Sequence, residues 1–247
     1  MNIVLLCKSW NHKKALEILT ALRQQSLQIR GIVALASITT KNSFSDFVRK
    51  TYEQNHHLPA TIAEYAQQHQ IEMVMVQDLN SDASVAALKR METDILLLGG
   101  VPIIRANVLA VPKICTLNVH MGLLPKFRGM NVAEWSIFCG EPVGVTVHQV
   151  DPGVDTGAIL YREIIEVSDC ANIEMMRAKV SRQQHQILAR CTRLFIEKKF
   201  VPEPQKKEGG KQYYMMHEKL RKVVEQRLSK GYIQDSLNRN DNHTDKE

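Results

Sequence analysis

Residues 117–163 read LNVHMGLLPKFRGMNVAEWSIFCGEPVGVTVHQVDPGVDTGAILYRE. The run that ends at His120 has the alternation of a β-strand, and a loop punctuated by Gly and Pro follows from Met121 to Gly129. A short helical stretch then leads to a second strand, expected from Val143 to Val150. The segment therefore predicts two strands of a sheet whose ends open into loops, which is where open α/β sheets bind ligands.

Three polar side chains of this segment suit one reaction. Asn118 and His120 lie two residues apart on the expected strand, so they point to the same face, and the turn after the second strand presents Asp155. In the transfer of an acyl group to an amine, an amide NH₂ stabilises the oxyanion and an imidazole moves a proton near neutral pH. A carboxylate orients that ring. Taken alone, an Asn-X-His pair is better explained by local hydrogen bonding. A catalytic role therefore has to be judged from the surrounding motifs.

The motifs occur in the order N-V-H, L-L-P-K-F-R-G, G-V-T-V-H and D-T-G, which resembles the N-formyltransferases that use 10-formyltetrahydrofolate. The resemblance is strong over residues 94–166 and faint outside them. It implies a Rossmann-like domain in which Asn118, His120 and Asp155 form the catalytic trio. One position departs from the pattern, because the family usually has Ser two residues after the catalytic His and this chain has Gly122.

The same resemblance implies a folate co-substrate, 10-formyltetrahydrofolate, bound by two segments. The residues expected to contact it are Gly100, Val101, Pro102, Ile103, Ile104, Val150, Asp151, Gly153 and Val154. Glycine at a strand end lets a flat ring approach the backbone, although without the resemblance Gly99-Gly100 is equally well explained as a turn. The chain has no G-x-G-x-x-G or Walker loop, which argues against a dinucleotide or ATP site.

The rest of the chain predicts an α/β fold. Short apolar runs alternate with helical patterns over the first 120 residues, as in a parallel sheet covered by helices. At 247 residues and 44% hydrophobic, the chain can bury a full core. We expect a Rossmann-like, mostly parallel sheet with flanking helices and a short helical C-terminal extension. The further strands are expected at Ile3–Leu6, Ile32–Ala36, Met73–Val76, Ile95–Leu98 and Ile159–Val167.

Composition changes after Ser168 and predicts three parts. Residues 1–168 form the expected formyltransferase catalytic domain, 169–234 a basic helical extension, and 235–247 a polar, disordered tail. The extension includes one long helix, expected over Ile173–Phe200. Its concentration of Lys and Arg suits a phosphorylated partner, and it is equally compatible with a solvated helix face.

Several classes are disfavoured by what the sequence lacks. Its five cysteines are dispersed and include no C-x-x-C pair, so neither a disulfide framework nor a zinc site is expected. No run approaches the roughly 18 apolar residues of a membrane span. These features predict a cytoplasmic protein with no membrane partner and no metal.

The amine that receives the formyl group is the least constrained part of the interpretation. Residues 7–12 lack the Gly- and Ser-rich loop of glycinamide ribonucleotide enzymes, and the tail is too short and helical for the β-barrel of methionyl-tRNA enzymes. A small, phosphorylated acceptor, a nucleotide-linked amino sugar, fits best. The residues expected to bind it are Lys8, Trp10, Lys126 and Arg128. An aromatic such as Trp10 is also commonly a core residue.

Other functions stay open at this stage. They are formylation of methionyl-tRNA or of glycinamide ribonucleotide, hydrolysis of formyltetrahydrofolate, and a non-catalytic binding module of the same fold. A homodimer is compatible with the sequence. An intact trio disfavours the binding module, because binding alone does not require an amide, an imidazole and a carboxylate at one point.

Overall fold

The computed structural model describes residues 1–8, 13–36, 61–206 and 210–232. The expected tail at 235–247 lies outside these residues. The chain folds into two compact units, each assembled from separate segments. Unit 1 comprises Met1–Asn118, Gln149–Pro152 and His185–Val201, and unit 2 comprises Val119–His148, Gly153–Gln184 and Pro202–Glu247. Each unit therefore draws on residues from both sides of position 168, where the composition changes.

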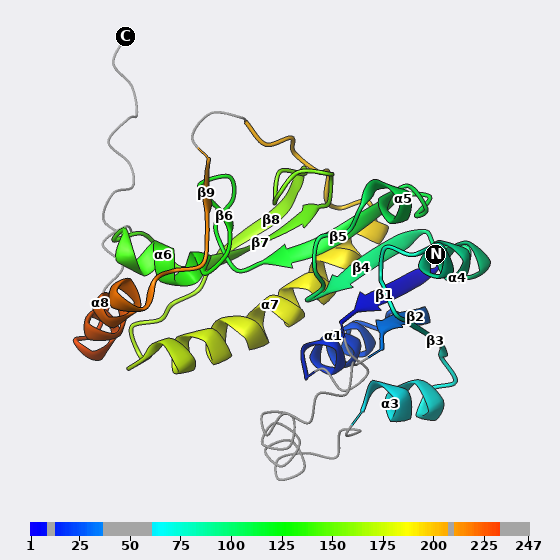
Figure 1. The fold of residues 1–247 in the computed structure, drawn as a ribbon, viewed down its shortest axis with the longest axis horizontal. Helices are drawn as coiled ribbons and strands as arrows, with labels where there is room; N and C mark the ends of the chain where they lie inside the picture. The colour runs from blue at the N-terminus through cyan, green and yellow to red at the C-terminus, as the bar shows by residue number, and fades with distance from the viewer. Residues whose placement is uncertain (9–12, 37–60, 207–209, 233–247) are drawn as a thin grey trace. The chain divides into compact units, whose positions relative to one another are not determined.

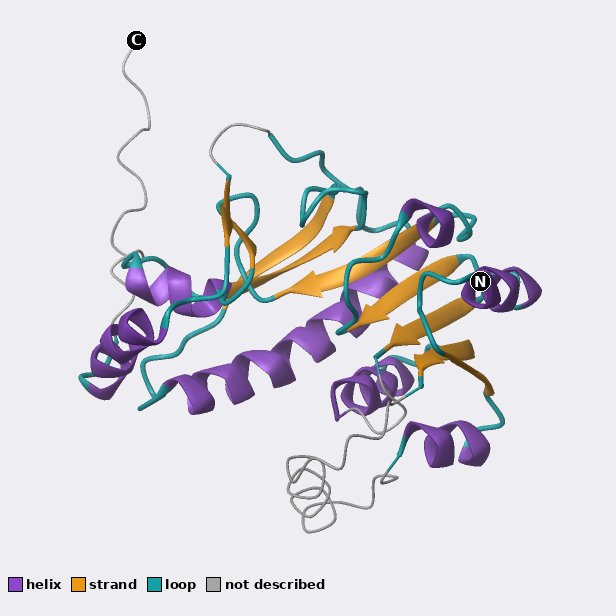
Figure 2. Cartoon of the chain, viewed as in Figure 1, coloured by secondary structure: helices purple, strands orange, loops and turns teal. Residues whose placement is uncertain are grey.

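Seven strands, drawn in Figure 2 and labelled in Figure 1, form one sheet in the order β3-β2-β1-β4-β5-β7-β8. Neighbours from β3 to β5 are parallel, and β7 and β8 are antiparallel. This confirms the expected mostly parallel sheet with flanking helices. The strands are β1 (Ile3–Cys7), β2 (Ile29–Leu35), β3 (Glu72–Val76), β4 (Ile95–Gly99), β5 (Cys115–His120), β7 (Gly144–Gln149) and β8 (Ile159–Ile164).

Apolar side chains fill the interior of unit 1. Every residue of β1 and of β4 is buried, as expected for parallel strands that are covered on both faces. The helices of this unit present apolar stripes, and Leu88 is fully buried in the same cluster as Val4 and Leu96. These helices are α1 (Lys13–Gln24), α3 (Ile62–Gln68), α4 (Asp82–Arg90) and α5 (Ala106–Leu109). Local sequence sets where they begin, since Thr61 and Glu64 form a capping box at α3.

Unit 2 contains a small two-stranded sheet that the sequence did not predict. Strands β6 (Phe127–Gly129) and β9 (Lys211–Tyr213) pair in parallel and lie side by side although far apart in the chain (Figure 1). Gly129 has a φ of +97°, and a Cβ there would overlap the carbonyl of Tyr213, so glycine is required for this pairing. The Tyr213 ring stacks on Phe127 with ring centroids 5.3 Å apart.

The remaining helices agree with the expected pattern. Helix α6 (Val132–Phe138) carries Trp135, whose ring packs edge to face on Phe138. The long basic helix is α7 (Ile173–Ile196), slightly shorter than expected, and the last helix is α8 (Glu218–Ser229). Helix α7 runs through both units, because the boundary between Gln184 and His185 falls inside it.

Candidate active site

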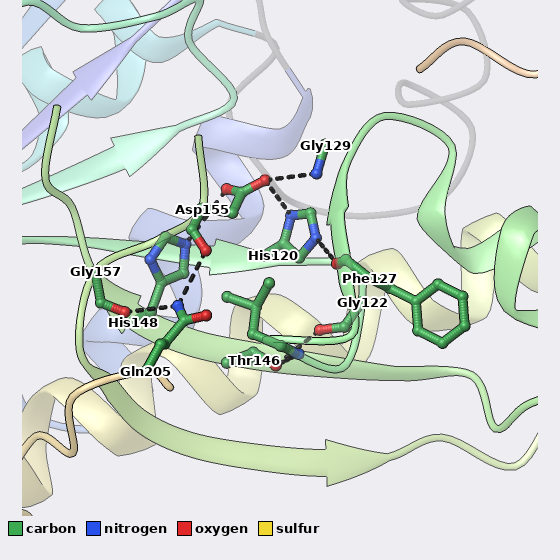
Figure 3. Close-up of polar contacts among 10 residues, drawn as sticks. His120, Gly122, Phe127, Gly129, Thr146, His148, Asp155, Gly157 and Gln205 are labelled. Carbon is green, nitrogen blue, oxygen red and sulfur yellow. Dashed lines mark hydrogen bonds and ion pairs between the residues drawn. The ribbon is translucent and has the colours of Figure 1, made fainter. Parts of the chain in front are cut away.

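Asp155 lies at the centre of a polar cluster in unit 2 (Figure 3). Its side chain is 15% exposed, and its φ of +53° is in the left-handed region, which Asp tolerates better than most residues. The backbone N–H of Gly129 donates to Asp155 Oδ2 at 2.9 Å. The carboxylate is thus held by the last residue of β6 as well as by its own turn.

His120 is buried at the end of β5 and touches two acceptors. Its Nδ1 lies 3.4 Å from Asp155 Oδ2, and its Nε2 lies 2.8 Å from the carbonyl oxygen of Phe127. A carbonyl can only accept a hydrogen bond, so Nε2 must carry a proton in this contact. A doubly protonated ring would donate to both partners. In such a charged ring no N–H is left over, so an oxyanion would have to replace the Phe127 carbonyl as the acceptor of Nε2–H.

His148 also faces Asp155, and the sequence did not single it out. Its Nε2 lies 3.6 Å from Asp155 Oδ1, and its side chain is only 2% exposed. The rings of His120 and His148 are edge to face, with centroids 6.4 Å apart. His148 is part of the G-V-T-V-H motif on β7. The alternation of side chains along that strand is the sequence signal from which His148 could have been predicted as a site residue. Both carboxylate oxygens of Asp155 are therefore faced by imidazole nitrogens.

The structure gives a physical reason for the departure at Gly122. A Cβ at this position would lie 2.9 Å from His120 Nε2 and 2.8 Å from the Phe127 carbonyl oxygen. The space that a serine would need is thus filled by the hydrogen bond between these two groups. Thr146 fixes the same loop, since its Oγ1 donates to the Gly122 carbonyl at 2.7 Å and accepts from the backbone N–H of Leu124 at 3.0 Å.

Asn118 lies on β5, two residues before His120, and is half-buried. It belongs to unit 1, whereas His120 and Asp155 belong to unit 2. The structure brings the histidine and the carboxylate together. The catalytic role of the amide stays a prediction.

The first segment expected to bind folate follows β4 in unit 1. Asn80 holds the carboxyl end of this segment, because its Nδ2 donates to the Ile103 carbonyl at 3.0 Å and its Oδ1 accepts from the Arg105 N–H at 2.7 Å. Gly100 has a φ of +76°, which glycine adopts without strain. Ile103 is 75% exposed, so this ordered segment presents an apolar side chain that a flat ring could cover.

The second folate segment is divided between the units. Val150 and Asp151 are in unit 1, where the Val150 N–H donates to the Thr116 carbonyl at 2.9 Å, whereas Gly153 and Val154 are in unit 2 beside Asp155. Val154 is 37% exposed. The assignment of both segments to folate binding stays a prediction.

The residues expected to bind the acceptor differ in their exposure and in their present partners. Lys8 is exposed just after β1, and Trp10 lies outside the described residues. Lys126 pairs with Glu141, with Nζ 2.6 Å from Oε1, and Arg128 donates to the Gly210 carbonyl at 3.0 Å. A phosphate would therefore have to compete with Glu141 for Lys126.

Catalysis by a cysteine nucleophile or by a bound metal ion finds little support in the described part of the chain. Burial raises the pKa of Cys7 to about 12 and that of Cys115 to about 11, so both thiols stay protonated and are poor nucleophiles. Among the described residues, no group of three or more His, Cys, Asp or Glu side chains could hold a metal ion.

None of the described helices has the length and apolar character needed to cross a membrane.

Known proteins match this chain in sequence. The sequence profile described as Formyl transferase matches residues 1–192. The methionyl-tRNA formyltransferase of Clostridium perfringens (strain SM101 / Type A) is 30% identical over 165 residues, which are 66% of this chain and 53% of the relative. The chain thus spans about half the length of the curated relatives it matches.

Solved structures share the fold at lower identity. A sugar N-formyltransferase from Shewanella sp FDAARGOS_354 superposes with a TM-score of 0.60 at 16% identity, covering 93% of this chain and 88% of that one. Glycinamide ribonucleotide transformylase 1 from Symbiobacterium toebii gives a TM-score of 0.60 at 20% identity, covering 83% and 95%. The profile match extends over more than half of the sequence and includes the turn that carries Asp155, and the chain accordingly belongs to the Formyl transferase family.

Proposed function

We propose that this chain transfers the formyl group of 10-formyltetrahydrofolate to a primary amine. The observation that carries the proposal is the Asp155 carboxylate, faced by His120 at 3.4 Å and by His148 at 3.6 Å in a chain of the Formyl transferase family. Charged imidazole beside a carboxylate supplies what acyl transfer to an amine needs, which is stabilisation of an oxyanion and a route for protons.

The bonds and protons of the proposed reaction can be followed step by step. The amine nitrogen attacks the formyl carbon, and its lone pair forms the new C–N bond while the carbonyl π electrons move to oxygen. His120 stabilises that oxyanion by donating from Nε2 in place of its contact with the Phe127 carbonyl, with Asn118 as a second donor. The C–N bond to the folate nitrogen N10 then breaks, the attacking amine loses a proton, and the leaving nitrogen gains one. Asp155 holds the imidazole in place and stabilises its charge throughout.

The acceptor we favour is a nucleotide-linked amino sugar. Among the structures of the same fold, an N-formyltransferase from Helicobacter canadensis is a complex with folinic acid and dTDP-3-aminofucose, with a TM-score of 0.56 at 16% identity. In unit 2, Arg128 lies on β6 next to Gly129, whose N–H holds Asp155, and a guanidinium suits a phosphate group of the acceptor. In unit 1, Lys8 is exposed after β1. We also propose residues 1–168 as the catalytic domain and 169–234 as an extension that helps to bind the acceptor.

Methionyl-tRNA is the second candidate acceptor. The curated relatives at about 30% identity carry that name, although the chain spans about half of their length. The two acceptors differ in the number of phosphates they present. Binding of tRNA would therefore depend steeply on salt, with log affinity falling by about 0.9 per phosphate contacted for each unit of log salt on duplex.

The test is formyl loss from 10-formyltetrahydrofolate with a panel of acceptors. The panel contains dTDP-linked amino sugars, glycinamide ribonucleotide and methionyl-tRNA, with a water-only reaction as the measure of hydrolysis. We expect turnover with an amino sugar and none above background for the His120→Gln variant. Turnover with methionyl-tRNA alone would overturn the sugar assignment, and no turnover beyond that of the variant with any acceptor would overturn formyl transfer itself.

A further inference from the structure

Gln205 clamps the turn that carries Asp155, although fifty residues separate the two along the chain. Its Nε2 donates to the backbone carbonyl of Asp155 at 3.0 Å and to that of Gly157 at 2.7 Å (Figure 3). The side chain is half-buried within unit 2. One amide group therefore fixes the backbone on both sides of Thr156.

The chemistry of this contact fixes the orientation of the amide. Both partners are carbonyl oxygens, which can only accept, so the group between them must be the NH₂ end of Gln205, with one N–H for each. Within the described chain, Oε1 of Gln205 is buried and accepts no hydrogen bond. The side chain is thus held through its two N–H groups, and both of them serve the Asp155 turn.

The segment around Gln205 is itself anchored. Glu203 and Ile159 exchange two backbone hydrogen bonds, each 2.8 Å long, which attach this segment to the start of β8. The anchor lies two residues before Gln205, so the amide reaches the turn from a fixed backbone. A glutamine on an anchored segment restricts a turn more than one on a free tail would.

The clamped residue is the one whose side chain faces both histidines. Asp155 has a φ of +53°, a conformation that a non-glycine residue keeps only when its surroundings hold it. In this conformation, its Oδ2 accepts from the Gly129 N–H at 2.9 Å and lies 3.4 Å from His120 Nδ1. Release of the backbone carbonyl would allow the turn to relax and the carboxylate to move away from these partners.

We propose that Gln205 is a positioning residue for formyl transfer, which acts by holding the Asp155 backbone so that the carboxylate faces His120. This inference rests on the proposed function, since positioning matters for rate only if Asp155 and His120 take part in the reaction. It assigns a role in the reaction to the segment after α7, where the sequence has no motif.

The experiment compares three variants in the full chain. Gln205→Ala removes the amide, and Gln205→Glu keeps its shape but replaces both donors with acceptor oxygens. Gln226→Ala is the matched control, because Gln226 is an exposed glutamine on α8 of the same unit. Two quantities are measured: the hydrogen-exchange rate of the Gly129 amide by NMR, and kcat and KM for 10-formyltetrahydrofolate with the best acceptor of the panel.

We expect both Gln205 variants to exchange the Gly129 amide faster and to lower kcat roughly 10-fold to 100-fold, the scale of a misplaced catalytic group, with KM within about three-fold. Gln226→Ala should change neither quantity. If Gln205→Glu behaved like the parent, donation by the amide would be irrelevant and the proposal would be wrong.

The exchange measurement separates failure of this proposal from failure of the proposed function. Unchanged exchange at Gly129 in Gln205→Ala would overturn the positioning role, whatever the parent's activity. Faster exchange with an unchanged kcat would overturn it as well. If the parent transferred no formyl group at all, the proposed function would fail and the role of Gln205 in formyl transfer would fail with it, even with faster exchange.

Discussion

Both compact units bury histidine against a carboxylate, and the pair in unit 1 differs in its surroundings from the His120–Asp155 pair in unit 2. In unit 1, His185 Nδ1 lies 2.7 Å from Glu17 Oε2, and both residues lie on regular helices, α7 and α1. In unit 2, His120 Nδ1 lies 3.4 Å from Asp155 Oδ2, and the carboxylate lies on a turn in the left-handed region. The shorter contact is thus the one in ordinary secondary structure.

The surroundings of the carboxylates explain the contrast. Glu17 also pairs with Lys13, one helical turn away on the same helix, at 3.8 Å. The Asp155 carboxylate is instead faced by two imidazoles and by the Gly129 N–H of β6, and Gln205 holds the Asp155 backbone carbonyl. We interpret the first pair as structural and the second as catalytic. A buried His–carboxylate pair alone is therefore a poor sign of a site, and convergence of several elements on one carboxylate is a better one.

The largest expected effect is that of Asp155→Asn. The substitution keeps the shape of the side chain but removes the charge that faces His120, so we expect kcat/KM for formyl transfer to fall at least about 10³-fold. Steady-state kinetics measure the fall, and urea unfolding checks that the variant is folded. A rate within ten-fold of the parent would remove Asp155 from the chemistry.

His148→Gln should have the next largest effect. The variant loses the imidazole 3.6 Å from Asp155 Oδ1 but leaves His120 in place, so we expect kcat to fall about 10-fold to 100-fold. Calorimetry with folinic acid should find an affinity close to that of the parent. Weaker folate binding with an unchanged kcat would instead assign His148 to binding.

His185→Ala should change stability and not chemistry. His185 is 1% exposed, so its removal leaves a cavity and deprives the Glu17 carboxylate of an imidazole nitrogen 2.7 Å away. We expect the free energy of unfolding to fall by about 2 kcal/mol, with kcat within about two-fold of the parent. Gln186→Ala, next in the chain and exposed, is the control and should change the unfolding free energy by less than about 0.5 kcal/mol.

The smallest effect is a pH dependence of stability that belongs to unit 1. Burial lowers the pKa of His185 below 6.5; the hydrogen bond to Glu17 opposes the shift, and Lys14 and Lys13 add to it. The folded state then binds fewer protons than the unfolded state, so stability is present above the unfolded pKa and is lost as pH falls below it.

Urea unfolding between about pH 7.5 and 5.5 measures this dependence. We expect the free energy of unfolding to fall with pH more steeply in the parent than in His185→Gln. Equal slopes in the two proteins would mean that His185 does not titrate differently on folding.

The sequence predicted the parts of the fold that depend on local periodicity. The apolar runs that became β1 and β4 and the stripe of α7 are visible in the chain, because burial on a strand or helix imposes a period. The pairing of β6 with β9 joins residues 127–129 to 211–213, and no local pattern encodes it. The composition change at residue 168 did not indicate that both units use segments from each side of it.

The residues of the candidate site were likewise predictable only in part. Asn118, His120 and Asp155 were identified from motif order, and the structure brings the last two together. His148 stood within a quoted motif but had no assigned role. Gln205 could not have been found, because its contacts are with backbone carbonyls 48 and 50 residues away, and backbone groups leave no mark on sequence.

The most direct test replaces each of two histidines, His120 and His185, with glutamine. His120→Gln and His185→Gln are measured in parallel for the rate of formyl transfer from 10-formyltetrahydrofolate and for the free energy of unfolding in urea. Our interpretation predicts that His120→Gln loses at least about 10³-fold in rate with a small change in stability, and that His185→Gln loses stability with its rate nearly intact. A folded His120→Gln variant whose rate stayed within a few-fold of the parent would contradict it.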